Sequence, residues 1–341
     1  MTTGRVGPEI RTSMKLLLCS LILIGLAITS LFVGVSNGAL NALIDGFGQN
    51  TGGMQERTAE AVTVMVTSRI PRTVALILAG VGLSVSGLIV QMLARNKFVE
   101  PKTVGTSESA AFGLLIVLLV APEMPIAGRM LVAMGFAMAG TALFLLLLQR
   151  ISWGSIYIVP LVGLMLGGVI EAATNFFAYR TDMMQALSNW TVGDFSNILQ
   201  GRYELLWLSL VLTIGAYLAA DRFTVIAMGE TVSTSLGLNY RRTVVFGVVI
   251  VSLITAVVVV TSGMIPFVGL IVPNLVTLIM GDNVRRNLPW VALTGACLLL
   301  ASDIAGRLIL HPYELPVGTT MGVIGGAGFL ALLLRSMRRD R

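Results

Sequence analysis

Apolar segments of membrane-spanning length follow one another along almost the whole chain, separated by short polar stretches. A hydrocarbon core of about 30 Å is crossed by roughly 20 helical residues. Windows of that size lie near residues 16–35, 70–92, 103–121, 129–148, 154–178, 203–220, 243–262, 265–280, 288–309 and 316–334. With 55% hydrophobic and only 12% charged residues among 341, the chain is too apolar for a water-soluble domain. The sequence therefore predicts an all-α membrane protein with about ten transmembrane helices.

The basic residues lie in short clusters between the apolar segments and not along one polar face. The net charge of +6 therefore indicates membrane topology and not nucleic-acid binding. The positive-inside rule favours an even number of spans with both termini in the cytoplasm. The predicted organisation is a cytoplasmic arm at residues 1–15, a single transmembrane domain at 16–334 and a basic cytoplasmic tail at 335–341. The first apolar segment is long and follows a basic arm, so we interpret it as a retained helix and not as a signal peptide.

Glycine and proline mark places where helices pack closely or break. The apolar segment from residue 265 is short and contains Pro266 and Pro273, so we expect a broken or partly re-entrant helix with its break at 263–269. The spacing of Gly163 with Gly167, and of Gly322 with Gly326, favours close helix approach in lipid. Hinges or backbone that lines a pore are the alternative interpretation of these glycines.

The sequence does not contain the patterns that ATP hydrolysis or metal binding requires. None of its three lysines (Lys15, Lys97 and Lys102) follows a glycine, which excludes a Walker A phosphate-binding loop. The single histidine, His311, has no neighbouring cysteine or second histidine, and Cys19 and Cys297 lie inside apolar segments as packing residues. We therefore predict no catalytic residue, no metal site and no cofactor bound by this chain.

Few ionisable residues fall inside the apolar segments, where each is costly and tends to face a partner or a cavity. Glu171, Thr174 and Asn175 share one segment and are candidates for the lining of a water-filled pathway, or for a hydrogen bond between helices. Asp303 and Arg307 stand at i, i+4, the favourable orientation for an ion pair on a helix. These isolated groups are fewer than an ion-coupled secondary transporter normally uses, but that class remains an alternative.

A polar stretch from Asp221 to Arg242 interrupts the apolar segments on the predicted cytoplasmic side. Almost all other segments of the chain are predicted to lie in the membrane. A polar loop of this length therefore indicates a contact surface for another protein. A second polar stretch, from Tyr179 to Glu204, contains Trp190, Gly193 and Asp194 and is predicted to lie at the outer membrane surface over the pathway.

Short motifs recur along the chain in a specific order. They are Arg69-Ile70-Pro71-Arg72, Ser86-Gly87 with Gln91, Arg95-Asn96 with Pro101 and Gly105, Gly229-Glu230 with Leu236-Gly237-Leu238, the run from Ile265 through Pro266, Gly269 and Pro273 to Asn274, Glu314-Leu315-Pro316-Val317-Gly318, and Gly325-Gly326. Each motif is weak alone, but in this order and spacing they closely resemble the FecCD/BtuC family of ABC-importer permeases, from about residue 60 to 335. Members of that family carry iron-siderophore complexes, haem or vitamin B12 inward.

The resemblance implies a BtuC-like, type II importer permease in a bacterial cytoplasmic membrane. It implies three kinds of partner: a second permease subunit, either another copy or a paralogue; two cytoplasmic ATPase subunits, which would hold ATP and Mg; and an extracytoplasmic substrate-binding protein. The family's coupling segment matches Ala227, Met228, Gly229, Glu230, Leu236, Gly237 and Leu238, which would form short helices that dock into the ATPase. The family's docking arginines match Arg69, Arg72 and Arg307, which would receive carboxylates of the binding protein. Simple anchoring at the membrane interface, or the Asp303 pair in the case of Arg307, is the alternative.

Three departures from the family pattern bear on the substrate. The usual Asn-Pro-Leu-Ala is Asn96-Lys97-Phe98-Val99 here, Asn274 stands where a histidine often follows Val-Pro, and Gly325-Gly326-Ala327 replaces Gly-Gly-Pro. These differences favour a ferric siderophore, of catecholate type, over vitamin B12. A haem or cobalamin permease of the same family is the alternative.

Overall fold

The computed structural model describes residues 8–33, 62–150, 158–201, 203–310 and 313–339. These residues form helices without any β-strand: α1 (Pro8–Phe32), η1 (Met65–Arg69), α4 (Ile70–Leu93), α5 (Thr106–Val120), α6 (Ile126–Gln149), α7 (Ile158–Arg180), α8 (Met184–Thr191), η2 (Glu204–Leu206), α9 (Trp207–Leu218), α10 (Ala220–Ala227), α11 (Glu230–Ser235), α12 (Tyr240–Ser262), α13 (Val268–Met280), α14 (Val284–Ile309) and α15 (Val317–Arg339). The prediction of an all-α fold is confirmed.

Each of the ten predicted windows coincides with a helix, but the helices are not equally long. Seven are long and apolar enough to cross a membrane, and α9 with α10 forms an eighth candidate that bends by 64°. Helices α5 and α13, with 15 and 13 residues, are shorter. At 1.5 Å per residue, each covers only about 20 Å of a hydrocarbon core of about 30 Å. Helices α1 and α15 also extend into the segments predicted as arm and tail, since they begin at Pro8 and end at Arg339.

The predicted break before the eighth window is confirmed. Residues 263–266 are not helical, and α13 begins only at Val268, after Phe267 adopts a positive φ of 68°. Pro273 lies inside α13. Its missing N–H and fixed φ are tolerated because the helix packs against α4 and α14 on both sides.

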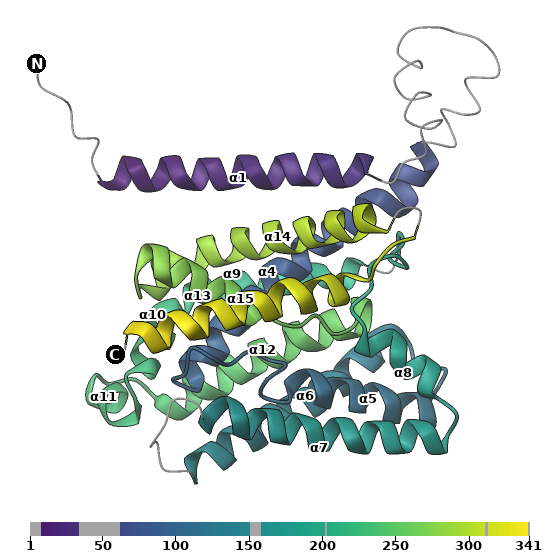
Figure 1. Ribbon diagram of the computed structural model, residues 1–341. Helices are drawn as coiled ribbons and strands as arrows, with labels where there is room; N and C mark the ends of the chain where they lie inside the picture. Colours follow the sequence, from purple (N-terminus) through teal and green to yellow (C-terminus); the bar gives the residue numbers. More distant parts are fainter. Residues whose placement is uncertain (1–7, 34–61, 151–157, 202, 311–312, 340–341) are drawn as a thin grey trace, which may run out of the picture.

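The two ends of the helix bundle carry different elements. Figure 1 shows the start of α1, the end of α15 and the short helix α11 at one end, and α8 at the opposite end. This arrangement agrees with an even number of crossings between the two chain ends. We refer below to the end with α11 as the inner end and the end with α8 as the outer end.

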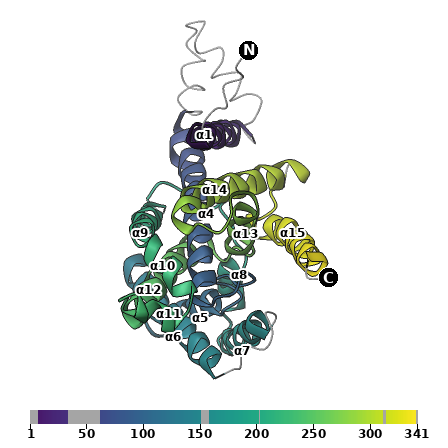
Figure 2. The same ribbon diagram turned by 90° about the vertical axis from the view of Figure 1, so that its left-hand side faces the viewer.

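Helix α4 forms the centre of the bundle, as Figure 2 shows. It packs against α9, α12, α13 and α14, and 89% of its membrane-length window is buried. An apolar sequence without a polar face suits a helix that is surrounded by protein. By contrast, only 6% of the window in α1 is buried, and this helix lies along α14 at the periphery (Figure 2).

Glycines let α4 approach its neighbours until backbone atoms are in contact. A β-carbon on Gly87 would lie 2.0 Å from the carbonyl oxygen of Gly269 in α13, and one on Gly80 would lie 2.6 Å from that of Gly295 in α14. Close packing is also confirmed for Gly163, where a β-carbon would lie 2.0 Å from the Thr103 carbonyl oxygen. Gly322 and Gly326 of α15 differ, because no described atom lies within 4 Å of their β-carbon positions.

Several of the family motif residues, scattered along the sequence, meet where the loop 94–105 packs against α13. The Gln91 amide donates to the Gly269 carbonyl at 3.4 Å, and the Asn274 amide donates to the Lys97 carbonyl at 2.7 Å. Pro101 contacts Gly269, and the Asn96 carboxamide oxygen accepts a hydrogen bond from the Phe98 amide within the loop. These contacts join α4, the loop and the start of α13 into one unit.

Glu100, which the sequence analysis did not single out, completes this junction. Its carboxylate accepts a hydrogen bond from the Phe267 amide at 2.8 Å, at the start of α13. The first amides of a helix have no partner within it, and a buried carboxylate satisfies such a donor. Glu100 therefore caps the short helix inside the protein, where water is not available.

We expect Gly87→Ala to destabilise the protein by about 1–3 kcal/mol, because the added methyl group would collide with the Gly269 backbone, which cannot move away as a flexible side chain can. The measurement is the apparent melting temperature of the detergent-purified protein. Gly135→Ala in α6 is the matched control, since nothing lies within 4 Å of its β-carbon position. Equal melting temperatures for the two variants would contradict the prediction.

Candidate functional site

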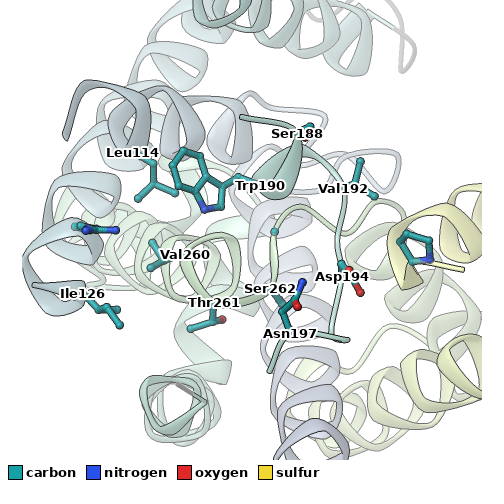
Figure 3. A pocket seen from close by; sticks show the side chains of 13 residues that line it. Leu114, Ile126, Ser188, Trp190, Val192, Asp194, Asn197, Val260, Thr261 and Ser262 are labelled. Atoms are coloured by element: carbon teal, nitrogen blue, oxygen red, sulfur yellow. The ribbon is translucent and has the colours of Figure 1, made fainter. Parts of the chain in front are cut away.

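A cavity of about 650 Å³ opens at the outer end of the bundle (Figure 3). Helices α5, α6, α8 and α12 contribute to its wall, together with residues 192–197 and Pro316. Figure 3 shows Trp190 beside Leu114 on one side of the cavity, and Asp194, Asn197 and Ser262 on the other. The polar stretch 179–204 that was predicted to lie at the outer surface thus supplies a large part of this wall.

Backbone hydrogen bonds hold the stretch 190–194 in place over the bundle. The Met264 amide donates to the Trp190 carbonyl at 2.9 Å, and the Asp194 amide donates to the Ser262 carbonyl at 2.8 Å. The Gly318 amide donates to the Gly193 carbonyl at 2.8 Å, which explains why the motif Pro316–Gly318 lies here. A β-carbon on Gly193 would lie 2.6 Å from the Met264 carbonyl oxygen, so only glycine fits.

A second, smaller cavity lies beside α7. It measures about 10 Å³, close to the space that one water molecule requires, and Glu108, Glu171, Thr174 and Asn175 line it. The structure thus brings together the three predicted pathway residues. The Thr174 hydroxyl donates to Ile170 of its own helix at 2.7 Å, so its hydrogen bond does not join two helices.

Glu108 is the residue of this cavity that sequence reasoning missed. It is 6% exposed, and its Oε2 atom has no hydrogen-bond partner among the described residues. An unpaired carboxyl group inside a protein is costly and tends to be retained for function. The available signal was the run Thr106-Ser107-Glu108-Ser109, which places an acid and three hydroxyl groups at the start of an apolar segment.

The two cavities are neighbours. Ala111 of α5 lines the smaller cavity, and Leu114, about one turn further along α5, lines the larger one. On α8 the adjacent residues Thr191 and Trp190 line the smaller and the larger cavity, respectively. Met264, which lines the smaller cavity, belongs to the same apolar cluster as Ala111 and Leu114. Glu171 and Asn175, which also line the smaller cavity, are exposed on α7.

Buried charges also gather at the outer end, around Asp303. Arg72 donates to Asp303 Oδ1 from two nitrogens, at 2.7 and 3.2 Å, and to Glu314 at 2.6 Å. Arg307 pairs with the other oxygen of Asp303, which confirms the predicted i, i+4 ion pair. Arg307 also donates to the Ser30 carbonyl and hydroxyl oxygens at 2.9 Å, so this cluster fastens α1 to α14.

The three arginines predicted to dock a binding protein all lie near this cluster. Arg72 is 6% exposed and Arg307 is 4% exposed, so Asp303 holds both guanidinium groups inside the protein in this conformation. Arg69 is half-buried and donates to the Val33 carbonyl at 3.1 Å. Their docking role stays a prediction.

Glu314 is the titratable group of this cluster that lies outside the membrane-spanning helices. Partial burial by itself raises the pKa of its carboxyl group, but the hydrogen bond and charge of Arg72, together with the charges of Arg307 and Arg69, lower the pKa below its ordinary value of 4.5. Glu314 therefore remains ionised at neutral pH, and its charge helps to balance the arginines.

The predicted coupling segment at the inner end forms a compact knob. Helix α11 lies between Gly229 and Gly237, whose φ values of 103° and 78° are accessible to glycine at little cost. The Ser233 hydroxyl is placed to donate to the Gly229 carbonyl at 2.6 Å and to the Val225 carbonyl of α10 at 3.0 Å. The predicted short helix between the two glycines is confirmed, whereas its binding to an ATPase is not tested by the structure.

Large apolar side chains are exposed on this knob among polar ones, although it lies at the inner end. Met228 is 59% exposed and Leu236 is 65% exposed, on either side of α11. Large apolar side chains in such a position are typical of a protein contact. Glu230 stands at the first position of α11, where its charge favours the helix N-terminus.

No metal centre is evident in the part of the chain that the structure describes, where no group of three His, Cys, Asp or Glu residues could share an ion. Cys19 and Cys297 are free thiols within apolar helices. His311 lies outside the described residues.

Comparison with known proteins adds three findings. The model of a family described as the FecCD transport family matches residues 21–335. The petrobactin import system permease protein YclN of Bacillus subtilis is 44% identical over 94% of this chain and 98% of its own length. The ferric-anguibactin transport system permease protein FatD of Vibrio anguillarum is 42% identical over 80% of this chain and 87% of its own.

Among solved structures, a chain from an inward-facing metal-chelate type ABC transporter aligns with a TM-score of 0.75 at 22% identity. The alignment covers 95% of this chain and 99% of that one. At this identity the similarity concerns the fold, and it shows that the helices are arranged as in that transporter chain.

We expect Glu314→Gln to lower the free energy of unfolding by up to about 1 kcal/mol at pH 7, a small value because the side chain is 34% exposed. A carboxyl group with a lowered pKa in the folded state stabilises above its ordinary pKa, and this stabilisation is lost as the pH falls. The difference from the wild type should therefore persist from pH 7 to about 5 and shrink as the pH falls below the ordinary pKa of 4.5. Melting temperatures at a series of pH values test this, with the exposed Glu123→Gln as control; a difference that does not change with pH would contradict it.

Proposed function

Because the chain belongs to the FecCD transport family, we propose that it is the permease subunit of an ATP-driven importer of a ferric siderophore. The observation that carries this proposal is the identity of 44% and 42%, over most of the chain, with permeases of petrobactin and ferric-anguibactin import. A haem or cobalamin cargo, which the same family also includes, is less consistent with these relatives. The departures at Asn96–Val99, Asn274 and Gly325–Ala327 support a catecholate-type siderophore.

In this proposal the chain is a multi-pass protein of the bacterial cytoplasmic membrane with both termini inside. Two ATPase subunits, which hold ATP and Mg, bind the inner end, and a siderophore-binding protein docks at the outer end. A second permease, identical or homologous, pairs with this one. The open glycine face of α15 at Gly322 and Gly326 supports such pairing, because small residues allow close approach between helices in lipid.

Contacts within the chain can carry a movement of α11 to the central helix. The hydrogen bond from Ser233 to Val225 joins α11 to α10. Phe223 of α10 stacks on Phe246 of α12, with ring centroids 6.3 Å apart. Next to this pair, Gly247 packs against Phe223 and against Leu93 and Ile89 of α4. When the ATPases close on ATP, α10, α12 and the end of α4 therefore move with α11.

The cargo passes between the two permeases and not through the core of one. The exposed face of α7, with Glu171 and Asn175 above the cavity of Glu108 and Thr174, would line this pathway. Small and weakly polar groups suit a conduit that must release its cargo. The buried Glu108 carboxyl group is also what an ion-coupled carrier would use, so the secondary-transporter alternative is tested through the dependence on ATP.

Docking of the binding protein would change the cluster around Asp303. Carboxylates of the partner can pair with Arg72 and Arg307 only if they replace Asp303 and Glu314, because these acids already occupy the guanidinium groups. Arg69, which donates to the Val33 carbonyl at 3.1 Å, is half-buried, whereas Arg72 and Arg307 are buried, so it is the most accessible of the three arginines to a docking partner.

The first experiment tests the coupling segment in the reconstituted importer. Leu236→Glu should abolish uptake of the ferric siderophore and reduce co-purification of the ATPase subunits by at least about tenfold, since a charge would enter an apolar contact. Val120→Glu, an equally drastic change at the outer end of α5, should leave ATPase binding intact. Uptake that continues without ATP or without the ATPases would instead establish an ion-coupled transporter.

The second experiment tests docking. Arg69→Glu should weaken binding of the siderophore-loaded binding protein at least about tenfold through repulsion of its carboxylates, and should remove its stimulation of ATP hydrolysis. Basal hydrolysis should persist, because the inner end is unchanged. Arg180→Glu, an exposed charge reversal at the outer end of α7, is the control. Wild-type affinity in Arg69→Glu would remove this arginine from the docking site.

A further inference from the structure

Helix α1 leaves an open crevice on the side of the bundle. It lies along α14 (Figure 2), which also packs against α13. Between α1 and α13 a cavity of about 170 Å³ remains, with α14 as its floor. The exposed side chains of Leu275 and Ile279 show that this region faces the surroundings of the bundle, which in a membrane is lipid.

The wall of this cavity is mostly apolar and includes one basic side chain. Leu275, Val276, Ile279 and Met280 of α13 form its apolar side, and Lys15 of α1 lines it as well. A cavity of about 150 Å³ with apolar walls stays dry and binds benzene, so this one can hold a segment of an acyl chain. Water is a poor occupant of such a space.

Lys15 and Trp290 place the cavity at the membrane interface. Lys15 lies in the second turn of α1, Met280 ends α13, and Trp290 lies in the second turn of α14, so all three are at the inner end. Trp290 lines the cavity, and its indole N–H has no hydrogen-bond partner among the described residues. Tryptophan is enriched at membrane interfaces, and a lysine near the inner surface attracts anionic lipid.

We propose that the crevice between α1, α13 and α14 binds one anionic phospholipid of the inner leaflet, with an acyl chain along Leu275 and Ile279 and the phosphate at Lys15. The lipid fills the gap that the loosely packed α1 leaves and fastens this helix to the bundle at the inner end. At the outer end, the contacts of Arg307 with Ser30 have the same effect. This inference depends on the chain lying in a membrane and not on the identity of its cargo.

The test compares lipid retention by the full-length protein. Wild-type protein is reconstituted in nanodiscs of phosphatidylcholine with phosphatidylglycerol, extracted into mild detergent, washed and analysed by native mass spectrometry. We expect one retained phosphatidylglycerol per chain. Lys15→Gln should reduce the preference for phosphatidylglycerol over phosphatidylcholine about fivefold, as expected for the loss of one basic residue near the membrane surface.

Two further variants separate this site from general attraction of lipid. Lys97→Gln removes another inner-end lysine that does not line the cavity and pairs with Asp282, so it should keep the wild-type preference. Thr294→Met fills the floor of the cavity and should reduce retention of both lipids. The proposal is overturned if the wild type retains no phospholipid, if Lys97→Gln has the same effect as Lys15→Gln, or if Thr294→Met retains lipid as the wild type does.

Discussion

Helix α4 crosses α13 at Gly87 and Gly269, and α14 at Gly80 and Gly295, so closely that no β-carbon fits at either crossing. In lipid the hydrophobic effect does not press helices together, because lipid tails are as apolar as leucine. Close contact of backbones supplies dispersion attraction instead. The remaining helices are arranged around the group that these two crossings create, and both the inner knob and the outer cavity are built on helices that contact it.

The second constraint applies where a helix starts inside the membrane. There, every buried backbone N–H and C=O group needs a hydrogen-bond partner within the protein. Helices α5 and α13 are short, and their starts are joined to the loop 94–105. Glu100 satisfies an amide at the start of α13, and Asn274 binds a carbonyl of the loop. The hydrogen bonds that satisfy these backbone groups also hold α4, the loop and α13 together. A movement of α4 caused by α10 would therefore reach the short helices as well.

The buried ionisable groups differ in whether a partner offsets the free-energy cost of their burial. At the outer end, Asp303 is fully buried but faces Arg72 and Arg307, so none of these charges is left alone. Glu108 is the opposite case, because one oxygen of its buried carboxyl group has no partner among the described residues. The first arrangement fastens helices and buries two of the three arginines for which docking is proposed, whereas the second places an unsatisfied polar group beside the proposed pathway.

Much of the fold could be predicted from the sequence. The ten apolar windows coincide with helices, the break at 263–267 was indicated by its glycines and prolines, and α11 lies between the two glycines that suggested it. These predictions succeeded because they concern local properties: the length of an apolar segment, the conformational freedom of glycine and the fixed φ of proline. The ion pair of Asp303 and Arg307 was equally local, since four residues separate them on one helix.

The contacts that could not be predicted from the sequence join residues that lie far apart in the chain. Arg72 reaches Asp303 across 231 positions, and Phe267 reaches Glu100 across 167, so no local pattern could indicate either contact. Glu108 was missed although the hydroxyl residues around it gave a local signal, and only the packing of α5 against α7 places it beside Glu171. The sequence by itself determined which segments enter the membrane, where they break and which family's motifs they carry. Only the tertiary structure decided which helix is central and which charges are paired, because both depend on how closely the backbones approach.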